Sequence, residues 1–272
     1  MKSTIFREFT SAFLAEIRKL LKLKTHVTFL AITLSLILLV LGAEVAISKN
    51  ASAPKGGAAA PVNLTVVWQI FHFFSQYLNP LIAALVAAYQ VGKEFEWKTF
   101  HQIQLKGQTA FTYLTSKLAA FYTLATGVYL TQAVVVTIFY TVRVLIEGQS
   151  IDIPFGQIAG DSLFYFTAIP IALMISILTV SASIGIVLSL VYLCVLEMII
   201  FPLIGSLTGA LGQHGIATAL SYTPMKLPVQ IVTTSDSFLE ALLLLAINLA
   251  VIVLTCFLSH LMLNRRQIGL IR

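Results

Sequence analysis

The chain has 272 residues, of which 58% are hydrophobic and only 10% are charged, and its mean hydropathy is +0.93. An ordinary soluble domain carries about 25% charged residues, so this composition excludes a chain that is water-soluble throughout. It predicts an all-α integral membrane protein. The two cysteines, Cys194 and Cys256, lie in apolar segments without metal-type spacing, and we expect both to be packing residues.

Residues 1–25 are predicted to form an amphipathic helix that lies in the membrane interface. Phe6, Phe9, Phe13 and Ile17 recur at steps of three and four, while the charged residues fall largely on the opposite side. A secretory signal peptide is the alternative. We reject it because the apolar run that follows is longer than a signal-peptide core of about 7 to 15 residues, and because the preceding segment is itself patterned.

Apolar stretches along the chain predict six membrane spans. A bilayer core about 30 Å thick needs about 20 helical residues to cross it. One stretch, at about 162–206, is roughly twice that length, and we divide it at the small residues Ser181-Ala182-Ser183. One long kinked or tilted helix, with five spans in all, is the alternative. The predicted spans are 27–48, 65–91, 118–141, 162–180, 184–205 and 239–263.

The distribution of basic residues predicts the orientation of the chain. Six spans place both termini on one side, together with most of the 17 Lys and Arg residues, and such basic flanks stay in the cytoplasm. Five spans would move Arg265, Arg266 and Arg272 to the outside. We therefore expect a multi-pass protein of a bacterial cell membrane with both termini cytoplasmic. The net charge of +6 is explained by this topology and by contact with anionic membrane lipid, so no nucleic-acid partner is expected.

One polar stripe runs along the second predicted span. Its five members are spaced by four, three, four and three residues, which places them on one face of a helix. They are Thr65, Gln69, His72, Gln76 and Asn79. Two interpretations stay open: hydrogen bonds that join neighbouring helices, at about 0.6 to 2 kcal/mol each, and the lining of a transport pathway or dimer interface.

Glu197 is an acid near the middle of the fifth predicted span, with no other charged residue near it in sequence. Ionisable residues inside the bilayer are expensive and often mark transport pathways, so Glu197 is a candidate pathway residue. A structural hydrogen bond to a neighbouring helix is the alternative. Glu44 and Glu240 lie close to the outer ends of their spans, so no second deep acid completes a proton relay.

Enzyme signatures are absent from the sequence. There is no G-x-x-x-x-G-K-[ST] loop for nucleotide phosphates, no H-E-x-x-H pair for zinc and no G-x-S-x-G nucleophile elbow. We therefore expect no enzyme activity in this chain, and no catalytic residue, metal ligand or cofactor of its own.

A charged and aromatic segment, Glu94 to Phe100, interrupts the apolar chain between the second and third predicted spans. The flanking spans place this segment at a membrane surface. Aromatic anchors rimmed by charged residues are typical of protein–protein interfaces. The segment is therefore predicted to dock another protein, and an ordinary interfacial loop is the alternative.

This segment resembles the cytoplasmic segment between the second and third spans of ABC type-2 permeases. Glu94-Phe95-Glu96-Trp97-Lys98-Thr99 precedes an apolar-containing stretch, and Lys117 opens the next span. The N-terminal interfacial helix, the six spans and a long, partly re-entrant outer segment before the sixth span are similar to the family as well. Two positions depart from the family pattern, since Lys98 stands where Gly is usual and Lys106-Gly107-Gln108-Thr109 replaces a Pro-x-x-Arg stretch.

The resemblance implies a single permease domain over residues 1–272. It also implies that the segment is a coupling helix, which enters a cleft on a separate ATPase subunit that binds ATP and Mg²⁺. Glu94, Glu96 and Thr99 match family positions, and the neighbouring aromatic residues supply apolar anchors. The expected ATPase-coupling residues are Glu94, Phe95, Glu96, Trp97, Thr99 and Phe100.

The function that follows is that of a permease subunit of an ABC exporter, which moves an amphipathic or hydrophobic cargo such as a peptide, lipid or drug. A six-span chain offers half of a two-fold pathway, so a second permease chain, identical or related, is expected as a partner. A secondary transporter or channel that uses Glu197 and the polar stripe is the first alternative. A membrane assembly subunit without transport is the second.

Overall fold

The structure is a computed structural model, and it describes residues 2–22, 31, 33–35, 37–38, 41–42, 65–105, 108–147, 153, 158, 160–161, 163–221, 223–224 and 238–270. These residues are helical apart from short turns, and none of them lies in a strand, which confirms the all-α class. Most of the predicted first span, 27–48, lies outside the described residues.

The helices follow the apolar pattern of the sequence closely. In chain order they are α1 (Lys2–Lys22), α3 (Thr65–Phe73), the wide π-helical turn η1 (Phe74–Leu78), α4 (Asn79–Glu96), α5 (Thr99–Leu105), α6 (Ala110–Glu147), α8 (Leu163–Thr179), α9 (Ala182–Leu190), the π-helical η2 (Val191–Ile200), α10 (Phe201–Ala210), α11 (His214–Ser221) and α13 (Phe238–Leu270).

Within the described part of the chain, four helical segments are long and apolar enough to cross a membrane, which supports a membrane protein. They are Val67–Glu96, Ala110–Ile146, Ala182–Ala210 and Leu242–Arg265. A shorter apolar helix, Phe166–Thr179, lies where the fourth span is expected. The third predicted span, 118–141, is the middle part of the much longer α6.

The long apolar run at about 162–206 is broken where the small residues lie. Helix α8 ends at Thr179, Val180 has a positive φ of 57°, and α9 begins at Ala182. Gly92 on α4 lies against this break, and a Cβ added to it would stand only 2.6 Å from the backbone nitrogen of Ala182. A residue without a side chain is therefore required for α4 to approach the α8–α9 turn so closely.

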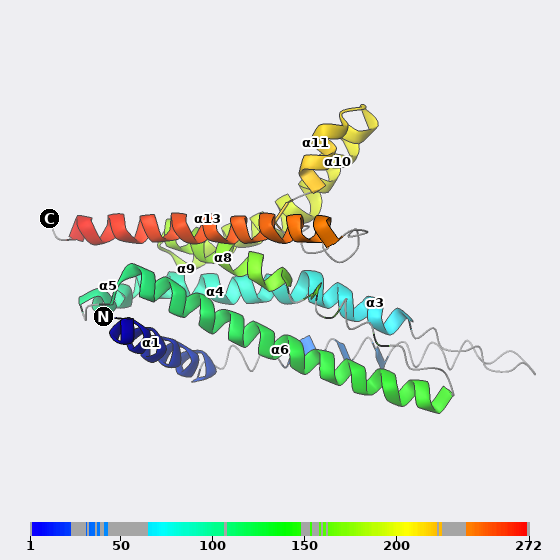
Figure 1. Cartoon of the computed structure of the whole chain (residues 1–272), viewed down its shortest axis with the longest axis horizontal. Helices are drawn as coiled ribbons and strands as arrows, with labels where there is room; N and C mark the ends of the chain where they lie inside the picture. The colour runs from blue at the N-terminus through cyan, green and yellow to red at the C-terminus, as the bar shows by residue number, and fades with distance from the viewer. Residues whose placement is uncertain are drawn as a thin grey trace, which may run out of the picture.

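The helices form an elongated bundle, with α4 in contact with α8 and α9, α1 with α6, and α13 with α8. The marked chain ends lie at the same end of the bundle as α5 (Figure 1), and we refer to it as the α5 end. Helix α11 folds back along α10, and this hairpin projects away from the other helices (Figure 1).

The core has two parts. The larger joins α1, α3, α4, α6 and α8 and contains buried aromatic residues such as Phe71 and Tyr129. The smaller is built from small side chains, with Ala84 and Ala88 of α4 and Ala168 and Ala172 of α8 around Leu193 of η2. Most of the large apolar residues of α9–α10 and α13 are exposed, as expected for helices that contact lipid or another chain.

Candidate functional site

Glu94, in the last turn of α4, accepts hydrogen bonds from side chains of two other helices. Its carboxylate accepts a hydrogen bond of 2.5 Å from Lys117 Nζ and one of 2.6 Å from the Tyr113 hydroxyl, and it also pairs with Lys19 of α1. Tyr113 and Lys117 are one helical turn apart on α6, so both reach the same face of α4. Glu94 is buried, and its charge is neutralised within the chain.

A second acid completes this arrangement. Glu16 of α1 accepts a hydrogen bond of 2.5 Å from Lys117 Nζ, and it lies three residues before Lys19 on the same helix. Buried charges persist in a fold only when they are paired and hydrogen-bonded, and two acids here balance two lysines. We call Glu16, Lys19, Glu94 and Lys117 the four-charge cluster, and it ties α1, α4 and α6 together.

The environment of the cluster lowers the pKa of Lys19. Burial disfavours the charged ammonium, the positive charge of Lys117 adds to this effect, and the carboxylate of Glu16 opposes it. The pKa of Lys19 falls from 10.5 to about 8. The ammonium of Lys19 is therefore easier to deprotonate than that of a free lysine.

Glu96, the last residue of α4, binds the beginning of α9. Its Oε1 accepts hydrogen bonds from the backbone nitrogen of Ala182 at 2.8 Å and from the Ser181 hydroxyl at 3.2 Å, while Oε2 accepts one from Lys93 at 2.8 Å. The first N–H groups of a helix lack partners within the helix, and a carboxylate there is also favoured by the helix dipole. Glu96 therefore caps α9 from a neighbouring helix.

The turn between α4 and α5 presents a mostly exposed surface. Trp97 and Lys98 form the turn, and Lys98 has a positive φ of 57°. Trp97 is 69% exposed and Leu105, at the end of α5, is 75% exposed. Lys93 Nζ lies 5.6 Å from the centre of the Trp97 ring, close enough for a cation–π contact.

The expected coupling residues therefore have different surroundings. Phe100 is buried, with its ring centre 4.8 Å from those of both Phe95 and Tyr113, and it anchors α5 on the bundle. Thr99 is half-buried and Trp97 is exposed. The structure brings all six residues to one end of the bundle, and their docking role stays a prediction.

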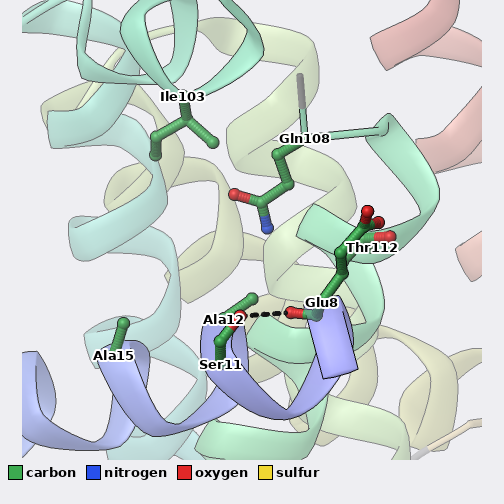
Figure 2. Close-up of a pocket in the computed structure, with 7 residues that line it drawn as sticks. All are labelled: Glu8, Ser11, Ala12, Ala15, Ile103, Gln108 and Thr112. Atoms are coloured by element: carbon green, nitrogen blue, oxygen red, sulfur yellow. Dashed lines mark hydrogen bonds between the residues drawn. The ribbon is translucent and has the colours of Figure 1, made fainter. Parts of the chain in front are cut away.

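A cavity of about 350 Å³ lies between α1, α5 and the beginning of α6. Figure 2 shows Ile103 and Gln108 reaching toward α1, where Ser11 and Ala12 form the opposite wall. Glu8 also lines the cavity, and its backbone carbonyl accepts a hydrogen bond of 2.9 Å from the Ser11 hydroxyl. Space thus remains between α5 and α1.

Most residues of the polar stripe in the second predicted span form hydrogen bonds with other residues of this chain. Asn79 donates a hydrogen bond of 2.5 Å to Gln132 of α6, and Gln132 donates one of 2.7 Å to Thr33. His72 and Gln76 both bind the buried carboxylate of Asp161, which precedes α8. These contacts favour the helix-joining interpretation for three of the five residues.

The other two stripe residues and Glu197 are placed differently. Gln69 is exposed, and the side chain of Thr65 lies outside the described part of the structure. Glu197 is only 2% exposed and accepts a hydrogen bond of 2.7 Å from the Tyr192 hydroxyl. The structure does not bring Glu197 into contact with the stripe through any interaction among the described residues.

Sequence reasoning missed most of the partners that complete these sites. Glu16, Tyr113, Gln132 and Asp161 received no role, although each is a polar residue within or beside an apolar segment. A charged or amide side chain in such a setting needs a partner, and that requirement was the available signal.

Comparison with known proteins does not assign this chain to a family. No protein-family model and no curated protein matches the chain. Among the described residues, no group of three or more His, Cys, Asp or Glu side chains could hold a metal ion. The functional conclusion therefore depends on the residues and their arrangement.

Proposed function

We propose that this chain is the membrane-spanning permease subunit of an ATP-driven ABC exporter. A separate ATPase subunit docks on the α4–α5 turn, and a second permease chain completes the pathway. The cargo is amphipathic or hydrophobic. The α5 end of the bundle faces the cytoplasm, and the interfacial helix α1 contacts anionic membrane lipid.

One observation supports the proposal most strongly. The exposed α4–α5 turn directly follows a helix end that is held by buried ion pairs. Trp97 and Leu105 offer apolar surface to a partner, whereas Glu94 binds α1 and α6 and Glu96 binds α9. A displacement of the turn is therefore transmitted to α1, α6 and α9 through short polar contacts. This arrangement favours a coupling element over an ordinary interfacial loop, because a loop does not need ion pairs and hydrogen bonds to several other helices.

The structure also divides the roles within the expected coupling segment. Glu94 is satisfied by Lys19, Tyr113 and Lys117, so we assign it to positioning the turn rather than to contact with the ATPase. Direct contact is assigned to the exposed Trp97 and to the end of α5. Buried aromatic anchors surrounded by charges account for most of the binding free energy in typical interfaces.

The experiment is a purification of the tagged full chain with its ATPase subunit from detergent-solubilised membranes. The double variant Trp97→Ala/Leu105→Ala is expected to lose most of the ATPase subunit, while the membrane domain keeps its unfolding temperature. The matched control is Leu145→Ala/Ile146→Ala, two similarly exposed apolar residues at the other end of α6. Unchanged ATPase stoichiometry in the first variant would remove the docking assignment.

A secondary transporter is the second candidate function, because the intramembrane carboxylate of Glu197 has one oxygen without a hydrogen-bond partner. The two functions differ in their energy source. Proteoliposomes that contain the complex are supplied with ATP alone or with a proton gradient alone. Uptake with ATP alone supports the exporter, and uptake with the gradient alone supports the secondary transporter.

A further inference from the structure

We propose that Glu197, Tyr192 and Ser189 form a membrane-embedded binding site for a lipophilic organic cation. As a statement about cargo, this inference rests on the proposed function, because it assigns positive charge to the exported molecule. As a statement about binding, it concerns this chain alone.

The three residues belong to a helix that buries one narrow stripe. Ser189, Leu193 and Glu197 recur every four residues and are all buried, whereas the apolar side chains around them are half-buried or exposed. Leu193 packs on the alanines of α4 and α8 that form the smaller core. The stripe therefore faces α4 and α8, and the carboxylate of Glu197 lies on the protein side of the span rather than the lipid side.

The π-helical geometry of η2 brings Tyr192 to Glu197. The Tyr192 hydroxyl donates a hydrogen bond of 2.7 Å to Glu197 Oε1, although the two residues are five positions apart. In an α-helix, five residues correspond to about 140° of rotation beyond one full turn, which points the side chains in different directions. In a π-helix the backbone N–H of residue i+5 bonds to the carbonyl of residue i, and the wider turn brings the side chains at i and i+5 closer together than in an α-helix. Wide turns of this kind occur often at functional sites.

Two polar atoms of the stripe lack partners. Glu197 Oε2 and Ser189 Oγ are buried, and neither has a hydrogen-bond partner in the described part of the chain. An unpartnered carboxylate oxygen in an apolar interior is costly, by several kcal/mol on typical scales. The segment 182–210 and α8 contain no Lys, Arg or His, and Lys93, the basic residue of α4, binds Glu96. A cationic ligand would supply the partner that both oxygens lack.

The surroundings of Glu197 favour an organic cation over a metal ion as the ligand. A hard metal ion takes about six to eight oxygen ligands, and only the free oxygens of Glu197 and Ser189 are offered on this stripe. An organic cation needs one carboxylate for its charge and apolar or aromatic surface for its body. The Tyr192 ring, whose hydroxyl binds the carboxylate, is half-buried and offers such surface.

Access to the carboxylate requires only a local change. Tightening of η2 toward α-helical geometry separates Tyr192 from Glu197, because the i+5 alignment is then lost. This frees the second carboxylate oxygen and turns the group around the helix axis. Ligand binding is therefore expected to break the Tyr192–Glu197 hydrogen bond.

The test measures binding of radiolabelled tetraphenylphosphonium to the purified full chain in lipid nanodiscs, without any ATPase. The expected result is saturable binding that weakens at least tenfold in Glu197→Gln and is unaffected by Glu8→Gln, an acid outside the span. Triphenylphosphine oxide, an uncharged relative of the probe, is expected not to compete. Absence of saturable binding to the wild-type chain, or equal binding by Glu197→Gln, would overturn the proposal.

A second measurement uses only the wild-type chain, so it does not depend on the folding of a variant. Dicyclohexylcarbodiimide modifies carboxyl groups in apolar surroundings, and mass spectrometry quantifies the product at Glu197. Tetraphenylphosphonium is expected to slow this modification in proportion to site occupancy, and an unchanged rate would contradict the site. Because neither assay needs ATP, a chain that binds the probe but no ATPase retains the site and loses the proposed function.

Discussion

Lys117 Nζ lies 2.5 Å from Glu94 Oε1, and the Lys117 side chain is only 1% exposed. This pair joins α6 to the last turn of α4, three residues before the exposed Trp97. The same ammonium binds Glu16, so one lysine connects three helices. The relationship explains how the buried charge of Lys117 is accommodated within the mostly apolar helix α6.

Replacement of Lys117 by Met is expected to destabilise the chain strongly. In the variant, Glu16 loses its lysine partner, and Glu94 keeps only one basic partner, Lys19. Removal of one member of a buried ion pair typically lowers the free energy of unfolding by about 3 to 5 kcal/mol. The free energy of unfolding in mixed detergent micelles measures the effect. Lys22→Met, on the exposed face of α1, is the control, and an equal loss in both variants would contradict a special role for the cluster.

Lys19 is expected to titrate near pH 8, because burial and the positive charge of Lys117 lower its pKa to about that value. Between about pH 8 and pH 10.5 the unfolded chain holds this proton and the folded chain does not, so the contribution of Lys19 to stability rises with pH in that window. Acylation of Lys19, followed by mass spectrometry at increasing pH, should show a midpoint near 8. A midpoint above 10 would contradict the lowered pKa of Lys19.

Gly92→Ala is expected to destabilise the bundle, because the new methyl group collides with the backbone of Ala182 across the α4–α9 contact. Overpacking of this kind typically costs about 1 to 3 kcal/mol, more where backbone must move. The matched control is Gly127→Ala on α6, where a new Cβ meets nothing within 4 Å. There the better helix propensity of Ala should stabilise the chain by about 0.5 to 1 kcal/mol. Equal effects at both glycines would exclude the close approach.

The buried amide side chains of Asn79 and Gln132 are expected to contribute to stability in a coupled way. Gln132→Leu leaves Asn79 without its hydrogen-bond acceptor and should cost about 0.5 to 2 kcal/mol of unfolding free energy. The double variant Asn79→Leu/Gln132→Leu removes both polar groups, and its loss should be smaller than the sum of the single losses. Additive losses would show that the two side chains do not interact. Gln69→Leu, at an exposed position of the same stripe, is the control.

The fold class and most helix positions could be predicted from sequence because apolar length and helical spacing are local properties. The break between α8 and α9 was placed correctly near Ser181, since a run of small residues gave a local signal. The π-helical turns η1 and η2 gave no such signal, because their apolar content is that of an ordinary span.

The candidate sites were less predictable because they depend on pairing between distant segments. Glu94 was singled out as a surface residue, and its actual partners lie 19 to 75 residues away along the chain. The stripe from Gln69 to Asn79 was recognised as one face, yet only the position of Asp161 and Gln132 distinguishes a joint between helices from a pathway. The spacing of residues along a sequence identifies which face of a helix they share. Which segment packs against that face depends on the tertiary structure.

The most direct test of the proposed coupling is photo-cross-linking from position 97 in living cells. A p-benzoylphenylalanine replaces Trp97, the membranes are irradiated, and the adducts are identified by mass spectrometry. We predict an adduct with a subunit that carries a nucleotide-binding P-loop, and none with that subunit from the same probe at Ile146. A probe at position 97 that yields no such adduct, in cells where the chain is folded and abundant, would contradict the assignment of the α4–α5 turn as the ATPase docking site.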